Sequence, residues 1–447
     1  MNTTSRIRKM VSVTTGIIWI VAAAHSFGQT ARTLTLEEAI QLSLQNSKQL
    51  KLSQTNVDIA GYNIREIREN QLPSLSVSGS YLRLNTPNIN LKIRTSSGSD
   101  TTTTEASSLQ VHQAMYGMAS ASLPIFSGFR FKYGLESARY LEQAAKLDAE
   151  SDREAVIQNT VAAYSNLYKA KKSLDLVAEN LLRERERVQE FTNREKNGLL
   201  ARNDLMKAQL QESNVQLALL DAENDLKVTT INMDLLLGLP ENTVLAADSA
   251  SFAMLKEEGN VNEWEQTALT HRKDMAANGI RRKAAESNIK VAKADFYPSL
   301  ALTAGYVALN IPGVAVIPNA MNAGIGLRYD IGSFWKSGAK IAQAKTQVYQ
   351  LKTNEEILMD RIHLEVNTAY YNYVLSKRKI DVYAKAVEQA NENYRITKNK
   401  FDNSLVNTTE LLDADVAQVQ SRINYEAAKA DAVVAYKKLE QTAGVIN

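Results

Sequence analysis

The feature that most constrains this 447-residue chain is an internal duplication. The stretch QLPSLSVSGSY at 71–81 resembles FYPSLALTAGY at 296–306, an offset of 296 − 71 = 225 positions. Further along, TVAAYSNLY at 160–168 matches VNTAYYNYV at 366–374, an offset of 366 − 160 = 206. One loop is therefore shorter in the second copy by 225 − 206 = 19 residues, and the register holds over most of the remaining chain. The fold must be built from two similar units.

Each unit is predicted to contain a helix, two strands joined by a loop, a very long helix, a break and a returning helix. The first unit spans 29–238 and the second spans 263–447. The intervening segment, 239–262, lies outside the repeat, and we expect it to act as a linker that packs around the middle of the helices. The predicted class is mainly α, with a small number of strands.

Strands are predicted where apolar and polar residues alternate. The first helix, about 36–71, has Thr35 as its expected cap, and Pro73 ends it. In the SLSVSGSYL segment that follows, Leu75 and Val77 share one face and serines occupy the other, which is the period-two pattern of a strand. The four predicted strands cover about 73–84, 114–126, 298–309 and 321–331.

The long helices, about 130–196 and 335–402, carry apolar residues every seven positions. The first has Leu167, Leu174, Leu181 and Val188, and the second has Tyr373, Ile380, Val387, Tyr394 and Phe401. This spacing predicts left-handed supercoiling against neighbouring helices. At ~1.5 Å per residue each helix would be ~100 Å long. Since the stretches between the apolar residues are highly charged, we expect the helices to project into water.

The first 28 residues have the pattern of a signal peptide. Three basic residues precede the mostly apolar segment Met10–Ala24, which is short for a membrane span, and small residues follow at positions 26 and 28. We expect the mature chain to begin near Gln29, with Ala24–Ser26 as a second candidate cleavage site. A retained membrane anchor is the alternative.

Composition excludes several classes of protein. Without the three basic residues of 1–28, Lys and Arg number 52 − 3 = 49, which equals the 49 Asp and Glu. This balance gives no indication of a nucleic-acid-binding protein. The chain has no Cys, which excludes disulfides, thiolate metal sites, a Cys nucleophile and a lipid-modified N-terminal Cys.

No catalytic or cofactor-binding motif is present. The four His, at positions 25, 112, 271 and 363, are far apart in sequence and lack the spacing of a metal site. The glycine-containing segments match no nucleotide-binding loop, and no Ser-His-Asp arrangement can be argued. We therefore expect neither an enzyme nor a bound cofactor or metal.

A membrane role would have to use the strands. No apolar run after residue 28 is long enough for a transmembrane helix. Strands of about ten residues suit a tilted crossing of a bilayer, but four strands cannot close a barrel, and open edges are not tolerated in lipid. Two chains would give eight strands and three would give twelve. Twelve leave a pore, so the argument favours three or more chains.

The chain resembles the TolC-like outer-membrane efflux proteins over nearly all of its mature length. The resemblance is carried by the duplicated Pro-Ser-Leu strand starts, the duplicated helical hairpins and the segment NSLVNTTELLDADVAQVQS. It implies a homotrimer with a twelve-stranded outer-membrane β-barrel, continued by a long periplasmic α-helical barrel. It also implies outer-membrane lipid, a periplasmic adaptor and an inner-membrane transporter as partners in efflux or type I secretion. The rival hypothesis is a passive coiled-coil envelope protein, but such a spacer would need no amphipathic strands.

The two helix breaks, at 197–203 and 403–409, then fall at the periplasmic ends of the hairpins. Gly198 suits the position just after a helix, and Asn407 or Thr408 can cap the returning helix. The expected tip residues are Gly198, Leu199, Asp204, Ser404 and Leu405.

Glu410 and Asp413, three residues apart, share a helix face. Acids in a first turn stabilise a helix through its dipole, which is one explanation for Glu410. The family resemblance offers another, a periplasmic aperture lined by Glu410, Asp413 and Phe401. In the first copy the residue matching Asp413 is Lys207, since 413 − 206 = 207. Phe401 and Val406 replace the Tyr and Arg of the family's best-known gate, which puts its polar latch in doubt.

Overall fold

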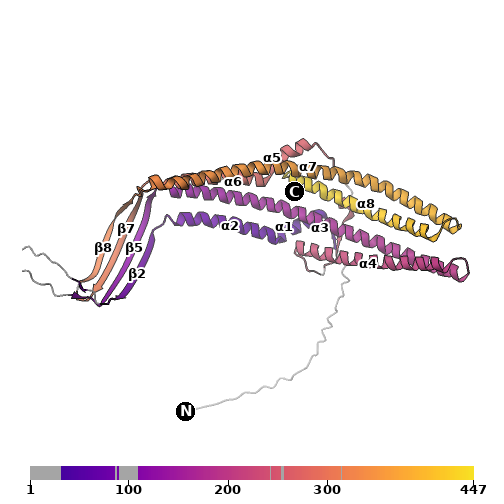
Figure 1. Cartoon of the computed structure of the whole chain (residues 1–447), viewed down its shortest axis with the longest axis horizontal. Helices are drawn as coiled ribbons and strands as arrows, with labels where there is room; N and C mark the ends of the chain where they lie inside the picture. The colour runs from indigo at the N-terminus through magenta and orange to yellow at the C-terminus, as the bar shows by residue number, and fades with distance from the viewer. Residues whose placement is uncertain (1–31, 86–87, 90–108, 242, 253–255, 314) are drawn as a thin grey trace, which may run out of the picture.

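The computed structural model describes residues 32–85, 88–89, 109–241, 243–252, 256–313 and 315–447. The predicted signal peptide, 1–28, lies outside the described residues. The molecule is elongated, with a sheet at one end and long helices that run away from it to two hairpin tips (Figure 1). We call these the sheet end and the tip end.

The sheet combines both copies. Its strands are β2 (Ser74–Arg83), β5 (Gln113–Ser127), β7 (Ser299–Ile311) and β8 (Ala315–Arg328), antiparallel in the order β2-β5-β7-β8. The short strands β3 (Asn88–Ile89) and β4 (Leu109–Gln110) pair with each other beyond it. Within the described residues β2 and β8 form the two edges, so one edge belongs to each copy.

The strand β8 differs from its prediction. It begins at Ala315 instead of about 321 and ends at Arg328 instead of about 331. Pro318, which cannot donate to a strand ladder, lies within the observed strand. The register with β7 shifts between Val307 and Leu309, opposite this proline, and the hydroxyl of Tyr306 donates to the carbonyl of Pro318 at 3.0 Å. A bulge at the edge of the sheet therefore accommodates the proline.

The first helix is also divided more finely than predicted. Thr35 caps it, accepting the Glu38 N–H at 3.2 Å, but α1 (Leu36–Asn46) stops short of α2 (Lys48–Glu69). Ser47 separates them, since its backbone is not helical (φ −58°, ψ 120°) and its hydroxyl accepts the N–H of Leu50 at 3.2 Å. A second cap therefore starts a second helix. The second copy has the same division, between α5 (Val261–His271) and α6 (Lys273–Lys293).

The long helices match the prediction closely. They are α3 (Arg130–Lys196) and α7 (Ser333–Asp402), and each returns through a shorter helix, α4 (Arg202–Leu237) or α8 (Thr408–Thr442). Toward the sheet end the contacts give the order α2-α3-α6-α7. Toward the tips the order is α4-α3-α8-α7, so α7 lies at the same edge in both halves, and α5 packs against it between them.

The main core lies midway along α3. Tyr164 is fully buried there, and its hydroxyl donates to the carbonyl of Leu34 at 2.7 Å and accepts the N–H of Asp248 at 2.8 Å. Phe252 stacks on the Tyr164 ring with centroids 5.7 Å apart. The described part of 239–262 forms two short elements, β6 (Leu245–Ala247) and the 3-10 helix η1 (Ser249–Phe252). The strand β6 pairs with β1 (Arg32–Leu34). This segment thus packs against the middle of the helices.

Both edges of the helical layer expose apolar stripes. On α7 the stripe consists of Tyr349, Ile357, Leu364, Tyr371, Leu375 and Val382. At the other edge, α2 and α4 expose Leu52, Ile59, Tyr62, Met206, Leu210, Leu217, Leu220, Val228 and Leu235. Tyr371 and the buried Tyr373 are two positions apart, about 200° around the helix, so the α7 stripe faces away from the helices that α7 packs on.

None of the described helices combines the length and the apolar character needed to span a bilayer.

Two glycines make close contacts at matching places in the two copies. Gly238 and Gly444, at φ +68° and +72°, follow α4 and α8. A Cβ on Gly444 would lie 2.9 Å from the backbone N of Arg272, whereas one on Gly238 would meet the side chain of Asn46 at 2.8 Å. The returning helices therefore end where each copy's short helices meet.

We predict that Gly444→Ala lowers the free energy of unfolding by about 1–3 kcal/mol, because it adds a left-handed alanine and a backbone clash. Gly279→Ala is the control, since Gly279 lies within α6 with nothing within 4 Å of its built Cβ. Denaturant unfolding of the purified protein measures both. Equal stability of the Gly444→Ala variant and the wild type would contradict the prediction.

Candidate functional site

The hairpin tips are built from two matching turns. After α3, the N–H of Leu199 donates to the carbonyl of Arg194 at 2.9 Å, and Gly198 has φ +72°. After α7, the N–H of Leu405 donates to the carbonyl of Lys400 at 2.8 Å, and Ser404 has φ +57°. These six-to-one bonds with a left-handed residue define the Schellman motif. Gly198 and Ser404, which were both expected in the turns, therefore occupy equivalent positions of the two copies, since 404 − 206 = 198.

The returning helices start differently in the two copies. Asn407 caps α8 by accepting the Glu410 N–H at 3.0 Å, and its side-chain amide donates to Glu410 Oε1 at 2.9 Å. Ala201 occupies the same capping position before α4 but provides no side-chain hydrogen bond. Glu410 thus has a structural role as the partner of the cap, as the dipole explanation anticipates.

The acids beyond this cap are exposed. Glu410 and Asp413 both lie on the surface of α8, and the described residues contain no ion pair to either. In the first copy Lys207 replaces the second acid. Its Nζ lies 3.3 Å from Asp204 Oδ1 and donates to the hydroxyl of Thr409 at 3.3 Å, which links the two hairpins. The α8 tip therefore keeps two unpaired negative charges, while the α4 tip is internally neutralised.

Phe401 lies in the interior of the tip and not on its surface. It is only 7% exposed and stacks on Phe191 with ring centroids 5.3 Å apart, while the Arg194 guanidinium lies 5.7 Å from its centroid. Leu205, Ala208 and Leu411 complete this cluster, and Val406 packs against it. Within one protomer the ring of Phe401 joins the two hairpins by apolar packing instead of lining an open surface.

Nearer the middle of the helices, a buried ionic cluster also joins the hairpins. Arg187 of α3 lies 2.7 Å from Glu184 Oε1 and 3.4 Å from Asp415 Oδ1 of α8. Arg187 also donates to the hydroxyl of Tyr394 on α7 at 3.2 Å. Glu184 and Asp415 are both 0% exposed.

These surroundings shift the acid–base equilibria of the cluster. Burial, the neighbouring Asp415 carboxyl and its negative charge together raise the pKa of Glu184 to about 8, against the lowering effect of Arg187. Burial alone would lower the pKa of Arg187, but Asp415 and Glu184 raise it, so Arg187 stays charged.

This cluster was not predicted from the sequence, although the sequence contains a signal for it. Leu181 and Val188 repeat every seven positions, and a heptad has a second core position between them. Glu184 occupies that position, and the cluster's Arg187 precedes Val188 directly. A charged residue at a core position of a heptad indicates a buried polar contact, but the pattern does not identify its partner.

A comparison with protein-family models supports this architecture. The model described as Outer membrane efflux protein matches residues 39–239 and 264–445, most of the chain. Outer membrane efflux protein BepC of Brucella suis is 23% identical over 346 residues, which cover 77% of this chain and 70% of that protein.

Solved channel structures share the fold. The CmeC outer membrane channel of Campylobacter jejuni matches 98% of this chain and 94% of its own, with a TM-score of 0.73 and 16% identity. VceC of Vibrio cholerae matches 92% of this chain and 96% of its own, with a TM-score of 0.71 and 16% identity. At these identities the similarity concerns the fold.

Two helical hairpins, two strand pairs and an internal duplication are thus the architecture of an outer-membrane channel. The chain belongs to the outer membrane efflux protein family, the TolC-like channels. It is an outer-membrane channel that extends into the periplasm and serves in tripartite efflux. Channels of this family form trimers and are not enzymes. The predicted fold class, function and location are confirmed.

The two tip turns allow a matched test of backbone strain. We predict that Ser404→Gly raises the free energy of unfolding by about 0.5–1 kcal/mol, because glycine adopts the left-handed region without a steric penalty. Gly198→Ser should lower it by a similar amount. Denaturant midpoints of both variants measure the effect. Shifts of the same sign in the two variants would show that backbone conformation does not control these turns.

Proposed function

We propose that three copies of this chain form a closed tunnel, in which α7 of one copy packs against α2 and α4 of the next. The unpaired edges of the sheet and of the helical layer support this proposal. β2 lies at the same edge as α2, and β8 leads directly into α7, so sheet and helices present the same two edges.

Physical considerations support this packing. An apolar stripe along a soluble helix normally marks a contact surface. The two stripes lie on opposite edges, so copies would associate head to tail, and such an interface makes a ring when the rotation closes. Joining β2 of one copy to β8 of the next would also satisfy the backbone groups of both edge strands, as a lipid environment demands.

We predict that Tyr371→Asp disrupts the trimer, because it places a charge in the middle of the α7 stripe, where Tyr371 is 62% exposed in the single chain. Asn372→Asp is the matched control, since Asn372 is exposed but lies about 100° away around the helix. Chemical crosslinking and native gel migration of the outer-membrane fraction measure assembly. Intact trimers of Tyr371→Asp would contradict the proposed interface.

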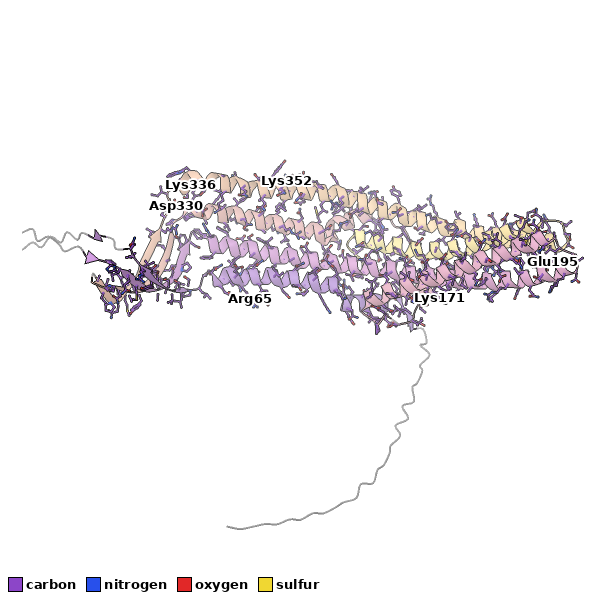
Figure 2. All side chains as sticks on the ribbon, turned by 60° about the horizontal axis from the view of Figure 1, so that its bottom comes forward. Arg65, Lys171, Glu195, Asp330, Lys336 and Lys352 are labelled. Carbon is purple, nitrogen blue, oxygen red and sulfur yellow. The ribbon has the colours of Figure 1, made fainter. Side chains whose placement is uncertain are left out.

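We further propose that Glu410 and Asp413 of the three copies surround the periplasmic mouth. The tip end lies farthest from the sheet, and Glu195 marks it in Figure 2, opposite Asp330 and Lys336 at the sheet end. Threefold symmetry would bring six carboxylates to this mouth, and rings of acids attract cations. The charges of the two hairpin tips in each copy differ. Asp204 forms an ion pair with Lys207 at the α4 tip, so the α8 tip is the strongly acidic one.

We predict that Glu410→Gln combined with Asp413→Asn reduces the cation preference of the channel and its block by divalent cations added on the periplasmic side. Asn407 can still cap the N–H of residue 410, so the trimer should assemble. Current–voltage recordings in planar bilayers measure both properties. Asp204→Asn is the control, because its carboxylate is already paired with Lys207.

If the double variant assembles with unchanged selectivity and block, Glu410 and Asp413 act only at the start of the helix. If instead Asp204→Asn changes selectivity as strongly as the double variant, the acidic mouth is formed by both hairpins.

The exposed tips provide the surface for the periplasmic adaptor, which in turn connects to an inner-membrane transporter. Leu199 and Leu405 support this role, because they are 77% and 73% exposed at matching positions of the two turns. Large apolar side chains at the ends of charged helices are suited to a protein contact.

A further inference from the structure

Glu184 and Asp415, two buried acids beside the guanidinium of Arg187, have an unusual charge balance. Glu184 comes from α3 of the first hairpin and Asp415 from α8 of the second, and neither side chain is accessible in the single chain. Arg187 is the one basic residue of the cluster that is itself buried. Two ionised acids with one buried base would leave an uncompensated negative charge inside the protein, which is costly.

The surrounding groups supply only part of the missing positive charge. Arg183 of α3 forms a long ion pair with Asp415, in which its Nε lies 3.9 Å from Asp415 Oδ1 without a hydrogen bond, and its Nη1 pairs with Glu179 at 2.7 Å. From α4, Glu212 lies 3.8 Å from Arg185 and thus belongs to a different pair.

On α7, the facing group is the hydroxyl of Tyr394, which accepts from Arg187. Lys398 of the same helix pairs with Asp402 at 3.1 Å.

Three carboxylate oxygens of Glu184 and Asp415 lack hydrogen-bond donors among the described residues. Glu184 Oε2 and both carboxylate oxygens of Asp415 are buried, and no donor among the described residues hydrogen-bonds to them. A buried acceptor without a donor costs free energy. A single proton on Glu184 would remove one negative charge and would turn Glu184 into a donor to Asp415. One proton therefore removes one negative charge and brings Glu184 Oε2 and one of the two Asp415 oxygens into a hydrogen bond.

We propose that Glu184 and Asp415 share one bound proton, and that this proton holds the two hairpins of a protomer together. The cluster bridges α3, α7 and α8, so loss of the proton would place two like charges across the hairpin contact. The proposal concerns the interior of one protomer and is independent of the acidic mouth formed by Glu410 and Asp413.

The direction of the pH dependence follows from linkage. The folded-state pKa of Glu184, about 8, lies above its ordinary value of 4.5. The stabilisation is therefore fully present below pH 4.5 and is lost as the pH rises toward 8. Hairpin separation exposes the pair to water, so in this range the opening equilibrium should increase by up to about tenfold per pH unit and then level off.

Hydrogen–deuterium exchange of the assembled protein tests this, with protection factors corrected for the chemical exchange rate at each pH. For α3 and α8 peptides around the pair, we expect wild-type protection to decrease by up to about tenfold per pH unit between pH 6 and 8. Glu184→Gln should lose this dependence, because its amide donates a hydrogen bond at every pH. Glu186→Gln is the matched control on the exposed face of α3 and should behave as wild type.

A wild-type protein without pH dependence, or a Glu184→Gln variant that retains the wild-type dependence, would overturn the proposal. Should Glu184→Gln fail to assemble, Asp415→Asn provides the same test. It removes the like charge beside Glu184 but leaves the burial, so the pH dependence of protection from 6 to 8 should become weaker than in the wild type. Persistence of the wild-type dependence in Asp415→Asn would equally refute a shared proton.

Discussion

The packing of α3 against other helices along its entire length is the interaction on which the rest of the structure depends. Near the sheet α3 lies between α2 and α6, and toward the tips it lies between α4 and α8. A helix of 67 residues in water depends on such lateral contacts, because its own hydrogen bonds provide little net stability. Since α6 and α8 belong to the second copy, the same contacts join the two copies into one body.

The exchange of helix partners midway along α3 explains the position of the main core. The returning helices end at this level, and the short helices α1 and α5 begin nearby, so the layer would be discontinuous without additional residues. Tyr164 and Phe252 fill this position, and the Tyr164 hydroxyl connects Leu34 to the segment between the copies. A segment outside the repeat thus has a packing role that neither copy supplies.

The two copies differ in the charges at their tips. Matching turns retain the same backbone geometry at Gly198 and Ser404, but the charges next to them differ. Lys207 neutralises its own hairpin, while Asp413 leaves the other hairpin acidic. The buried Glu184 and Asp415 likewise come from different copies and meet between the hairpins. Duplication therefore preserved the framework, while the polar contacts between the hairpins became asymmetric.

The sequence by itself determined the two-unit architecture, the long helices and the positions of both tip turns, because these depend on local periodicity, capping and glycine. It placed both ends of α3 correctly. The Ser47 cap that starts α2 is also a local signal, which the prediction missed, whereas only the tertiary structure showed that β8 accommodates Pro318. The buried position of Phe401 and the meeting of Glu184 with Asp415 were also decided by tertiary structure. Heptad spacing identifies which face of a helix is buried, but the partner across that face depends on how distant helices align, which local sequence does not encode.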